Sequence, residues 1–226
     1  MTKKNVSELL FEEFCAKAGI QCRSIPTEKG ARTPDYELIL TNQTLIAEVK
    51  EIERNKEEIE SDRLLEQRGY GNAIGGVPGQ RVRQKIQSCS SQIKARSCGV
   101  HPSLLVLYEC HFAAVNIEPY HIRVAMYGLE TFVLAVPESG RPYIIDKKFG
   151  PRQKMTQIHN TSISAIATIR KIYTSATDCG VTYFYVYHNK YAAIPLDADL
   201  LKPYGVTQFR IGEAEVGFIP EWEQIA

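Results

Sequence analysis

The sequence predicts an α/β domain whose C-terminal half is rich in β-strands, and three patterns support this fold class. Residues 6–19 have apolar side chains at helical spacing. Residues 33–52 contain two alternating apolar segments joined by a short polar connection, and residues 103–110 form an apolar run that follows a helical pattern. The chain has 226 residues and 44% hydrophobic content, which suits a sizeable core. We therefore expect a single domain over residues 1–226.

The first helix is predicted within VSELLFEEFCAKAGI, which covers residues 6–20. We expect Ser7 to be the N-cap, because a serine oxygen can accept from the free backbone N–H groups of a first turn. We expect Gly19 to end the helix, because glycine readily adopts the left-handed conformation that follows many helices. The apolar residues of this helix are Leu9, Leu10, Phe14 and Ala18, and its acids are Glu8, Glu12 and Glu13.

An antiparallel hairpin is predicted for TPDYELIL and TLIAEVKEI, which are joined by the polar residues 41–43. Glu48 and Lys50 are two residues apart on the second strand and therefore point to the same face. Asp35 begins the first strand and can meet Glu48. Two such carboxylates would hold a hard divalent cation through oxygen, and a lysine beside them could orient or deprotonate water or stabilise charge on a phosphate. The pattern favours metal-dependent cleavage of phosphodiesters.

Pro34-Asp35 followed by Glu48-Val49-Lys50 resembles the PD-(D/E)xK nuclease superfamily, the fold of many restriction endonucleases and Holliday-junction resolvases. The resemblance covers about the first hundred residues. It implies a restriction-endonuclease-like mixed sheet flanked by helices, in which the strand at 103–110 runs parallel to a neighbour after a right-handed crossover. It divides the chain into a catalytic core at 1–110, containing a charged and glycine-rich insertion at 54–80, and a β-rich C-terminal elaboration at 111–226.

The resemblance also implies a role for each residue of the motif. Asp35 and Glu48 would bind Mg²⁺ or Mn²⁺ with the Val49 carbonyl as a further ligand, and Lys50 would position or activate the attacking water. The superfamily often carries a further acid on the helix before the first core strand. Glu8 fits that pattern best and would join the metal directly or through water. The implied partner is nucleic acid, DNA rather than RNA.

An ordinary structural role is the alternative for the same residues. Asp35 could start a turn after the proline, and Glu48 and Lys50 could form a charge pair on a half-exposed strand. Their neighbours Ile46 and Val49 are apolar, however, so a nearly buried strand would carry charges that it should avoid unless they are paired or used. This favours the functional interpretation.

Between the hairpin and the strand at 103–110, a charged helix is expected at 51–68. The glycine-rich segment at 69–80 that follows is either a loop that orders over a substrate or a flexible linker. A further helix is predicted at 81–97 from its apolar spacing, and no acid lies between Glu66 and Glu109, so this stretch suits phosphate. The candidates for nucleic-acid binding here are Arg81, Arg83, Gln84, Lys85 and Gln92.

The C-terminal half is predicted to be mostly β-structure. Residues 131–149 favour a hairpin and residues 181–188 a strand, while the tail is expected to be irregular. Two segments are open: 118–128 suits a helix or an edge segment, and 162–173 alternates at first and then suits a helix. The row of Tyr183, Tyr185 and Tyr187 suits a core face better than a base-stacking surface.

Composition favours a cytoplasmic protein without membrane contact. The formal net charge is +1, no apolar run reaches membrane-spanning length, and acids occur where a signal peptide would need an apolar segment. The six cysteines include no CxxC pair and suit reduced, buried positions. A zinc site drawn from Cys89, Cys98, His101, Cys110 and His111 fits no recognisable zinc spacing.

The sequence therefore predicts a divalent-metal-dependent endonuclease that hydrolyses phosphodiester bonds, with DNA as its substrate and Mg²⁺ or Mn²⁺ as its cofactor. Double-strand cutting by a chain with one site would suggest a homodimer. Two alternatives are open at this point. The chain could be a nucleic-acid-binding or scaffold module on the same fold without turnover, or a nuclease that is activated only by a partner or a small-molecule signal.

Overall fold

The computed structural model describes residues 4–26, 33–70, 76–97, 99–109, 117–138, 140–173, 180–213 and 217–226. The helices are α1 (Val6–Ala18), α2 (Lys56–Arg68), α3 (Gln80–Ser97) and α4 (Pro119–Tyr127), with short 3₁₀ helices at Ala198–Leu200 and Lys202–Tyr204. The strands are β1 (Gln21–Ser24), β2 (Tyr36–Ile39), β3 (Thr44–Ile52), β4 (Ser103–Glu109), β5 (Glu130–Ala135), β6 (Tyr143–Phe149), β7 (Ala165–Ile172), β8 (Val181–His188), β9 (Thr207–Ile211) and β10 (Trp222–Gln224).

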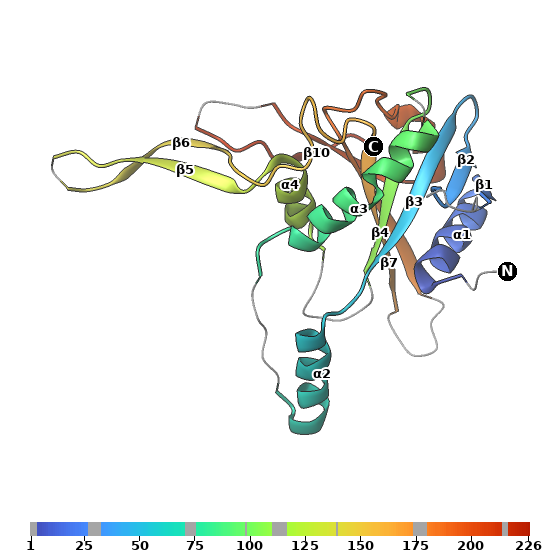
Figure 1. Cartoon of the computed structure of the whole chain (residues 1–226), viewed down its shortest axis with the longest axis horizontal. Coiled ribbons are helices and arrows are strands. Elements are labelled where there is room, and N and C mark those ends of the chain that lie inside the picture. The colour runs from blue at the N-terminus through green and yellow to red at the C-terminus, as the bar shows by residue number, and fades with distance from the viewer. Residues whose placement is uncertain are drawn as a thin grey trace.

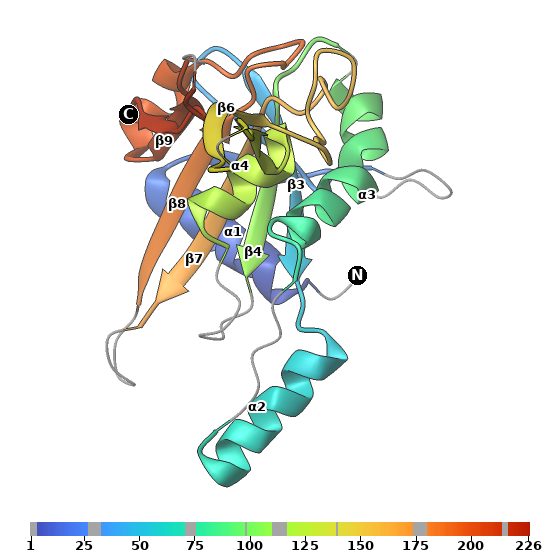
Figure 2. The ribbon, with the colours of Figure 1, turned by 90° about the vertical axis from the view of Figure 1, so that its left-hand side faces the viewer.

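Within the described ranges, eight of these strands form one mixed sheet in the order β1-β2-β3-β4-β7-β8-β9-β10. α1 covers one face of this sheet, and α3 and α4 lie against the other (Figures 1 and 2). The α/β class and the mixed sheet flanked by helices are thus confirmed. β5 and β6 form a separate two-stranded arm that extends away from the body (Figure 1).

The N-cap of α1 is Asn5, so the expected cap at Ser7 is wrong. Asn5 Oδ1 accepts a hydrogen bond from Glu8 N (2.9 Å), and Glu8 Oε2 accepts one from Asn5 N (2.9 Å), which forms a capping box. Asn5 is followed three residues later by the glutamate that this box needs, whereas Ser7 is followed by Leu10. Gly19 ends the helix with φ 73°, as predicted.

α1 packs on the sheet through Leu10, Phe11 and Cys15, which are buried against β2, β3 and β4. Phe14 is partly buried, and its ring stacks on Phe184 of β8 at a centroid distance of 4.3 Å. Leu9 was expected among the packing residues but is 54% exposed. The buried stripe therefore runs through Phe11 rather than Leu9, and it anchors the helix across several strands.

The predicted hairpin is confirmed, because β2 pairs antiparallel with β3 with Tyr36 opposite Ala47. β3 also pairs with β4, and this pair is parallel, as the family resemblance implied. The two strands are connected through α2 and α3. Alternate residues of β3 face opposite layers: Leu45, Ala47 and Val49 join the core under α1, whereas Ile52 joins the core under α3.

The second face of the sheet is covered by α3 and α4. The apolar positions of α3 are buried as its spacing predicted, and they pack with α4 and with Leu105 and Leu107 of β4. The segment at 118–128, which suited a helix or an edge segment, contains the helix α4, and Pro119 occupies its first turn. These two helices enclose the second core layer.

The C-terminal half supplies the rest of the sheet. The ambiguous segment at 162–173 contains a strand, β7, which lies between β4 (parallel) and β8 (antiparallel). The tail, expected to be irregular, contains β10, which pairs antiparallel with β9. β7 depends on pairing with β4, which is distant in sequence, whereas β10 pairs with the strand that directly precedes it. Tyr187 is a core residue, as expected for the tyrosine row, whereas Tyr183 at the strand's other end is exposed.

Two elements stand apart from this core. The β5–β6 hairpin is confirmed, and it exposes large apolar side chains, including Phe132, Leu134 and Tyr143. α2, the helix expected from the charged segment, lies away from the sheet (Figures 1 and 2). Residues 71–75 of the glycine-rich segment lie outside the described residues. No helix in the described ranges has the length and apolar character needed to cross a membrane.

Replacement of Phe11 by alanine is expected to lower the free energy of unfolding by about 3–4 kcal/mol, because a fully buried aromatic ring leaves a cavity. Leu9→Ala on the same helix is the matched control and should change stability by less than about 0.5 kcal/mol, because Leu9 is mostly exposed. Urea unfolding of the two variants measures the difference. Equal losses in both would contradict the packing of α1 described here.

Candidate active site

Asp35 and Glu48 lie opposite each other at the end of the β2–β3 hairpin. Tyr36 is paired with Ala47, so the same register one residue further places Asp35 opposite Glu48. Leu40 N donates to Gln43 O (3.0 Å) at the turn, and hydrogen-bonded pairs alternate from there. Asp35 and Glu48 therefore form a non-hydrogen-bonded pair. The side chains of such a pair lie closer together, and its Cα atoms are about 4.5 Å apart.

The Asp35 carboxylate is held in place by the backbone of β3. Val49 N donates a hydrogen bond to Asp35 Oδ2 (2.8 Å). By the register of the hairpin, Pro34 stands opposite Val49, and a proline has no N–H with which to bind the Val49 carbonyl. The backbone ladder therefore stops at this point, and β2 leaves the carbonyl oxygen of Val49 available beside Asp35.

Glu48 is fully buried, and Lys50 of the same strand forms an ion pair with its Oε1. Its other oxygen, Oε2, has no hydrogen-bond donor among the residues that the structure describes. A buried carboxylate oxygen without a partner is costly, so a ligand that supplies positive charge at this point would be favourable. The Lys50 side chain is 29% exposed and reaches the same place from the solvent side.

The ionisation of these groups follows from burial and mutual charge. Burial, followed by the charge of Asp35, raises the pKa of Glu48 to about 7. Burial also raises the pKa of Asp35, although the hydrogen bond from Val49 and the charge of Lys50 oppose it. For Lys50, burial lowers the pKa, but the charges of Glu48 and Asp35 outweigh burial and raise it. It is therefore unfavourable for both carboxyls to be ionised at once. A divalent cation would stabilise the doubly ionised pair.

Glu8 lies on α1 with its carboxylate engaged in the capping box. Its Oε2 accepts from Asn5 N, and its charge contributes to the raised pKa of Asp35. The other two acids of this helix bind lysines: Glu12 pairs with Lys4, and Glu13 pairs with Lys17 and Lys171. Of the three, Glu8 is therefore the acid whose charge acts on Asp35.

The α3 candidates have different environments. Arg83 is 2% exposed, and its guanidinium donates to Pro78 O and Arg152 O, so it has no free surface for phosphate and its expected role is corrected to a structural one. Arg81 forms an ion pair with Glu58 of α2. Gln92 Nε2 donates to Thr33 O (3.3 Å) and so binds the segment that leads into Asp35. Gln84 is exposed and Lys85 is half-buried.

The donor set fits a hard divalent cation. Carboxylate oxygens of Asp35 and Glu48 and the Val49 carbonyl are the ligands that Mg²⁺ and Mn²⁺ prefer, and the unpartnered oxygen of Glu48 is the observation that supports the fit. Within the described residues, no cluster of three or more acidic, histidine or cysteine side chains has metal-binding geometry. The preformed set is thus two carboxylates and backbone, which would leave further positions to water and substrate.

Cysteine positions bear on the same region. Cys89 of α3 is a buried free thiol, and burial, followed by the charge of Glu48, raises its pKa to about 12. Cys15 is a buried free thiol, as expected, whereas the free thiol of Cys22 is only half-buried. Of the zinc set considered from sequence, Cys98, Cys110 and His111 lie outside the described residues. The placement of Cys89 near Glu48 was not expected from sequence; only the apolar spacing of its helix indicated that it faces the sheet.

One further acidic residue was not predicted as functional. Glu109 at the end of β4 is buried in a pocket with Arg170, on the strand next to the one that carries Glu48. The only signal for it in the sequence is that it interrupts an otherwise apolar run.

Comparisons of the chain with protein-family models, with curated proteins and with solved structures found no match. Its function is therefore inferred from its own residues and their geometry.

The stability of the metal-free protein is expected to depend on Glu48 between pH 4.5 and 7. A carboxyl whose pKa rises to about 7 on folding stabilises the protein fully below its unfolded pKa of about 4.5, and this contribution is lost as pH rises through 7. Glu48→Gln should therefore be more stable than the wild type at pH 8, by roughly 2–3 kcal/mol, with the difference disappearing near pH 4.5.

Urea unfolding in EDTA at a series of pH values measures this difference. Glu57→Gln on the exposed face of α2 is the control and should run parallel to the wild type. Mg²⁺ at millimolar concentration should restore the stability of the wild type at pH 8 and leave Glu48→Gln unchanged. If the stabilities of Glu48→Gln and the wild type changed with pH in parallel, the pKa of Glu48 would not be raised by folding, and the prediction would be wrong.

Proposed function

We propose that this chain is a divalent-metal-dependent nuclease that hydrolyses phosphodiester bonds, with DNA as its preferred substrate and Mg²⁺ or Mn²⁺ as its cofactor. The observation that carries the proposal is the pairing of Asp35 with the fully buried Glu48 beside the Lys50 ammonium. An ordinary charge pair on a half-exposed strand would leave its carboxylate in water. Here the carboxylate is inside the sheet, with one oxygen unpartnered among the described residues.

The proposed fold family is that of the restriction endonucleases. The order of elements supports this assignment: α1 comes before an antiparallel hairpin that carries the motif, and α3 connects the hairpin to the parallel strand β4. The C-terminal strands extend the same sheet beyond β4. These strands therefore enlarge the sheet on the side of β4 that lies away from the hairpin with the motif.

The residues have distinct roles in this proposal. Asp35, Glu48 and the Val49 carbonyl would hold the cation, which lowers the pKa of a bound water and neutralises charge on the phosphate. Asp35 is oriented for this by Val49 N, so the backbone of one residue would supply both a ligand and the hydrogen bond that positions another. Glu8 adds negative charge near Asp35 and would act through water.

Lys50 would hold or move the proton. In the free protein, the charges of Glu48 and Asp35 keep its pKa raised, so it is an ammonium at neutral pH. A cation held by both carboxylates would offset their charge, and burial, which lowers the pKa of Lys50, would then no longer be opposed. Lys50 would then be better able to exchange a proton with the attacking water, and as an ammonium it would stabilise the phosphate.

Lys50→Ala and Asp35→Asn are each expected to reduce cleavage of supercoiled plasmid by at least about 100-fold, because each removes a group that acts on the reacting phosphate or its cation. Nicking and linearisation by the purified chain in Mg²⁺, Mn²⁺ or EDTA measure this effect. Lys56→Ala at the exposed start of α2 is the matched control and should cut like the wild type.

Cleavage that persists in EDTA, or normal cutting by both site variants, would show that the assignment is wrong. Calorimetry of Mn²⁺ binding separates the remaining cases. Binding without cleavage by the wild type would favour a nuclease that needs an activating partner or signal. Absence of both would favour a nucleic-acid-binding module without turnover.

A further inference from the structure

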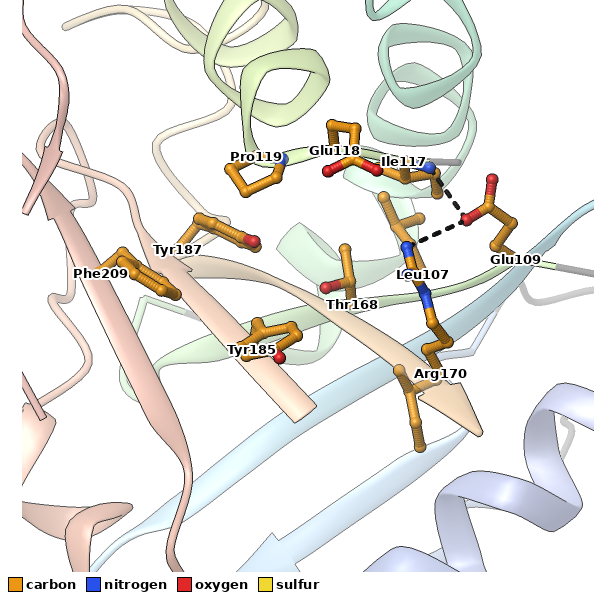
Figure 3. Close-up of a pocket in the computed structure, with 11 residues that line it drawn as sticks. Leu107, Glu109, Ile117, Glu118, Pro119, Thr168, Arg170, Tyr185, Tyr187 and Phe209 are labelled. Carbon is orange, nitrogen blue, oxygen red and sulfur yellow. Dashed lines mark hydrogen bonds and ion pairs between the residues drawn. The ribbon is translucent and has the colours of Figure 1, made fainter. Parts of the chain in front are cut away.

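A pocket of about 330 Å³ lies over the sheet, between its strands and the beginning of α4 (Figure 3). β4, β7, β8 and β9 form its floor, and the residues that lead into α4 form its opposite wall. Its volume is at the lower end of the range for small-molecule sites. None of the residues that line it belongs to the Asp35–Glu48–Lys50 group.

Glu109 is the buried polar group of this pocket, with only 8% of its side chain exposed. Its Oε2 accepts a hydrogen bond from Ile117 N (2.9 Å) and lies 3.8 Å from the guanidinium of Arg170 (Figure 3). Its Oε1 has no donor within the described residues. Burial raises the pKa of this carboxyl to about 7. A ligand with an exocyclic amino group would supply the donor that the described residues do not.

The remaining walls are aromatic and apolar. Tyr185, Tyr187 and Phe209 line one end, where the Tyr187 and Phe209 rings stack at a centroid distance of 5.2 Å and an angle of 13°. The Tyr187 hydroxyl and Thr168 are both directed toward the interior (Figure 3). Flat apolar walls with a few polar groups suit a planar ring with hydrogen-bonding edges.

The charges of the pocket select against an anion. Glu109 and Glu118 both line it, whereas Arg170 is its cation and already faces Glu109. A phosphate inside would meet two carboxylates. A neutral ring that bears an amino group would stack on the aromatic side chains and donate to a carboxylate, in the way that acidic side chains accept from the amino group of cytosine.

We propose that this pocket binds a nucleobase, with Glu109 as the acceptor for its amino group and Tyr185 as a stacking wall. The base comes either from a strand at the candidate active site or from a free nucleoside. The strand source rests on the proposed function: Leu107, which lines the pocket, is the neighbour of Lys50 on the adjacent strand, so the near wall of the pocket begins about 5 Å from the strand of the motif on the same face.

Calorimetric titration of adenosine, cytidine, guanosine and uridine into the full chain in EDTA tests the site without metal or cleavage. At least one nucleoside with an amino group should bind at least about tenfold more tightly than uridine. At pH 8, where a carboxyl with a pKa of about 7 is mostly ionised, Glu109→Gln should weaken that binding at least about tenfold, because it replaces a charged acceptor, while the amide can still accept from Ile117 N. Tyr185→Ala should weaken it at least about fivefold.

Two controls keep the test specific to the pocket. Tyr143→Ala removes an exposed tyrosine of the β5–β6 arm that does not line the pocket and should leave binding unchanged. Thr168→Val keeps the volume of the side chain and serves as a second pocket variant if Glu109→Gln alters the melting temperature. It should weaken binding severalfold by removing the hydroxyl.

Fluorescence anisotropy of a labelled single-stranded oligonucleotide in EDTA distinguishes the two sources. Loss of oligonucleotide affinity in Glu109→Gln, with weak nucleoside binding, supports a base that enters from a strand. Tight nucleoside binding that is unaffected by Lys50→Ala supports a free ligand, and it would stand even if the chain proved not to be a nuclease. The proposal is overturned if neither probe responds to the pocket variants, or if inorganic phosphate competes with the nucleoside.

Discussion

The hydrogen bond from Val49 N to Asp35 Oδ2 is the contact on which the candidate site depends. β2 and β3 pair through backbone groups as far as Tyr36, and Pro34 cannot continue the ladder. The carboxylate of Asp35 takes the place of a strand carbonyl, so a side chain closes the end of the hairpin. The same residue is thereby oriented toward Glu48. One local departure from regular pairing thus serves both the fold and the site.

Burial of Glu48 is the cost that accompanies this geometry. β3 has apolar residues toward α1, but its other face carries Glu48 and Lys50 under α3. Lys50 compensates only one oxygen of Glu48, and Asp35 adds a like charge close by. A sheet optimised for stability alone would place apolar side chains here. The arrangement is understandable if a cation completes it, since a divalent ion can neutralise both carboxylates at once.

Much of the fold and the motif could be predicted from local patterns, because helix spacing, strand alternation and the hairpin are each encoded in a short segment of the sequence. The cap of α1 was misplaced because Asn5 and Ser7 are both good caps, and only the reciprocal bond from Glu8 decides between them. β7 was ambiguous because its alternation fades, and pairing with β4 and β8 decides its conformation. The buried position of Arg83 depends on the nearby carbonyl of Pro78 and on that of Arg152, which is distant in sequence and which no local pattern reveals.

The pocket around Glu109 could not be predicted from local patterns either. Its residues come from four strands and the start of α4, and only the register across the sheet brings them together. That register also places the pocket and the motif on one face. The two sites would differ in charge once a cation is bound at the motif. A cation at Asp35 and Glu48 would attract phosphate, whereas Glu109 and Glu118 would repel it. A nucleotide on this face would therefore be oriented, with its phosphate toward the motif and its base toward the aromatic walls.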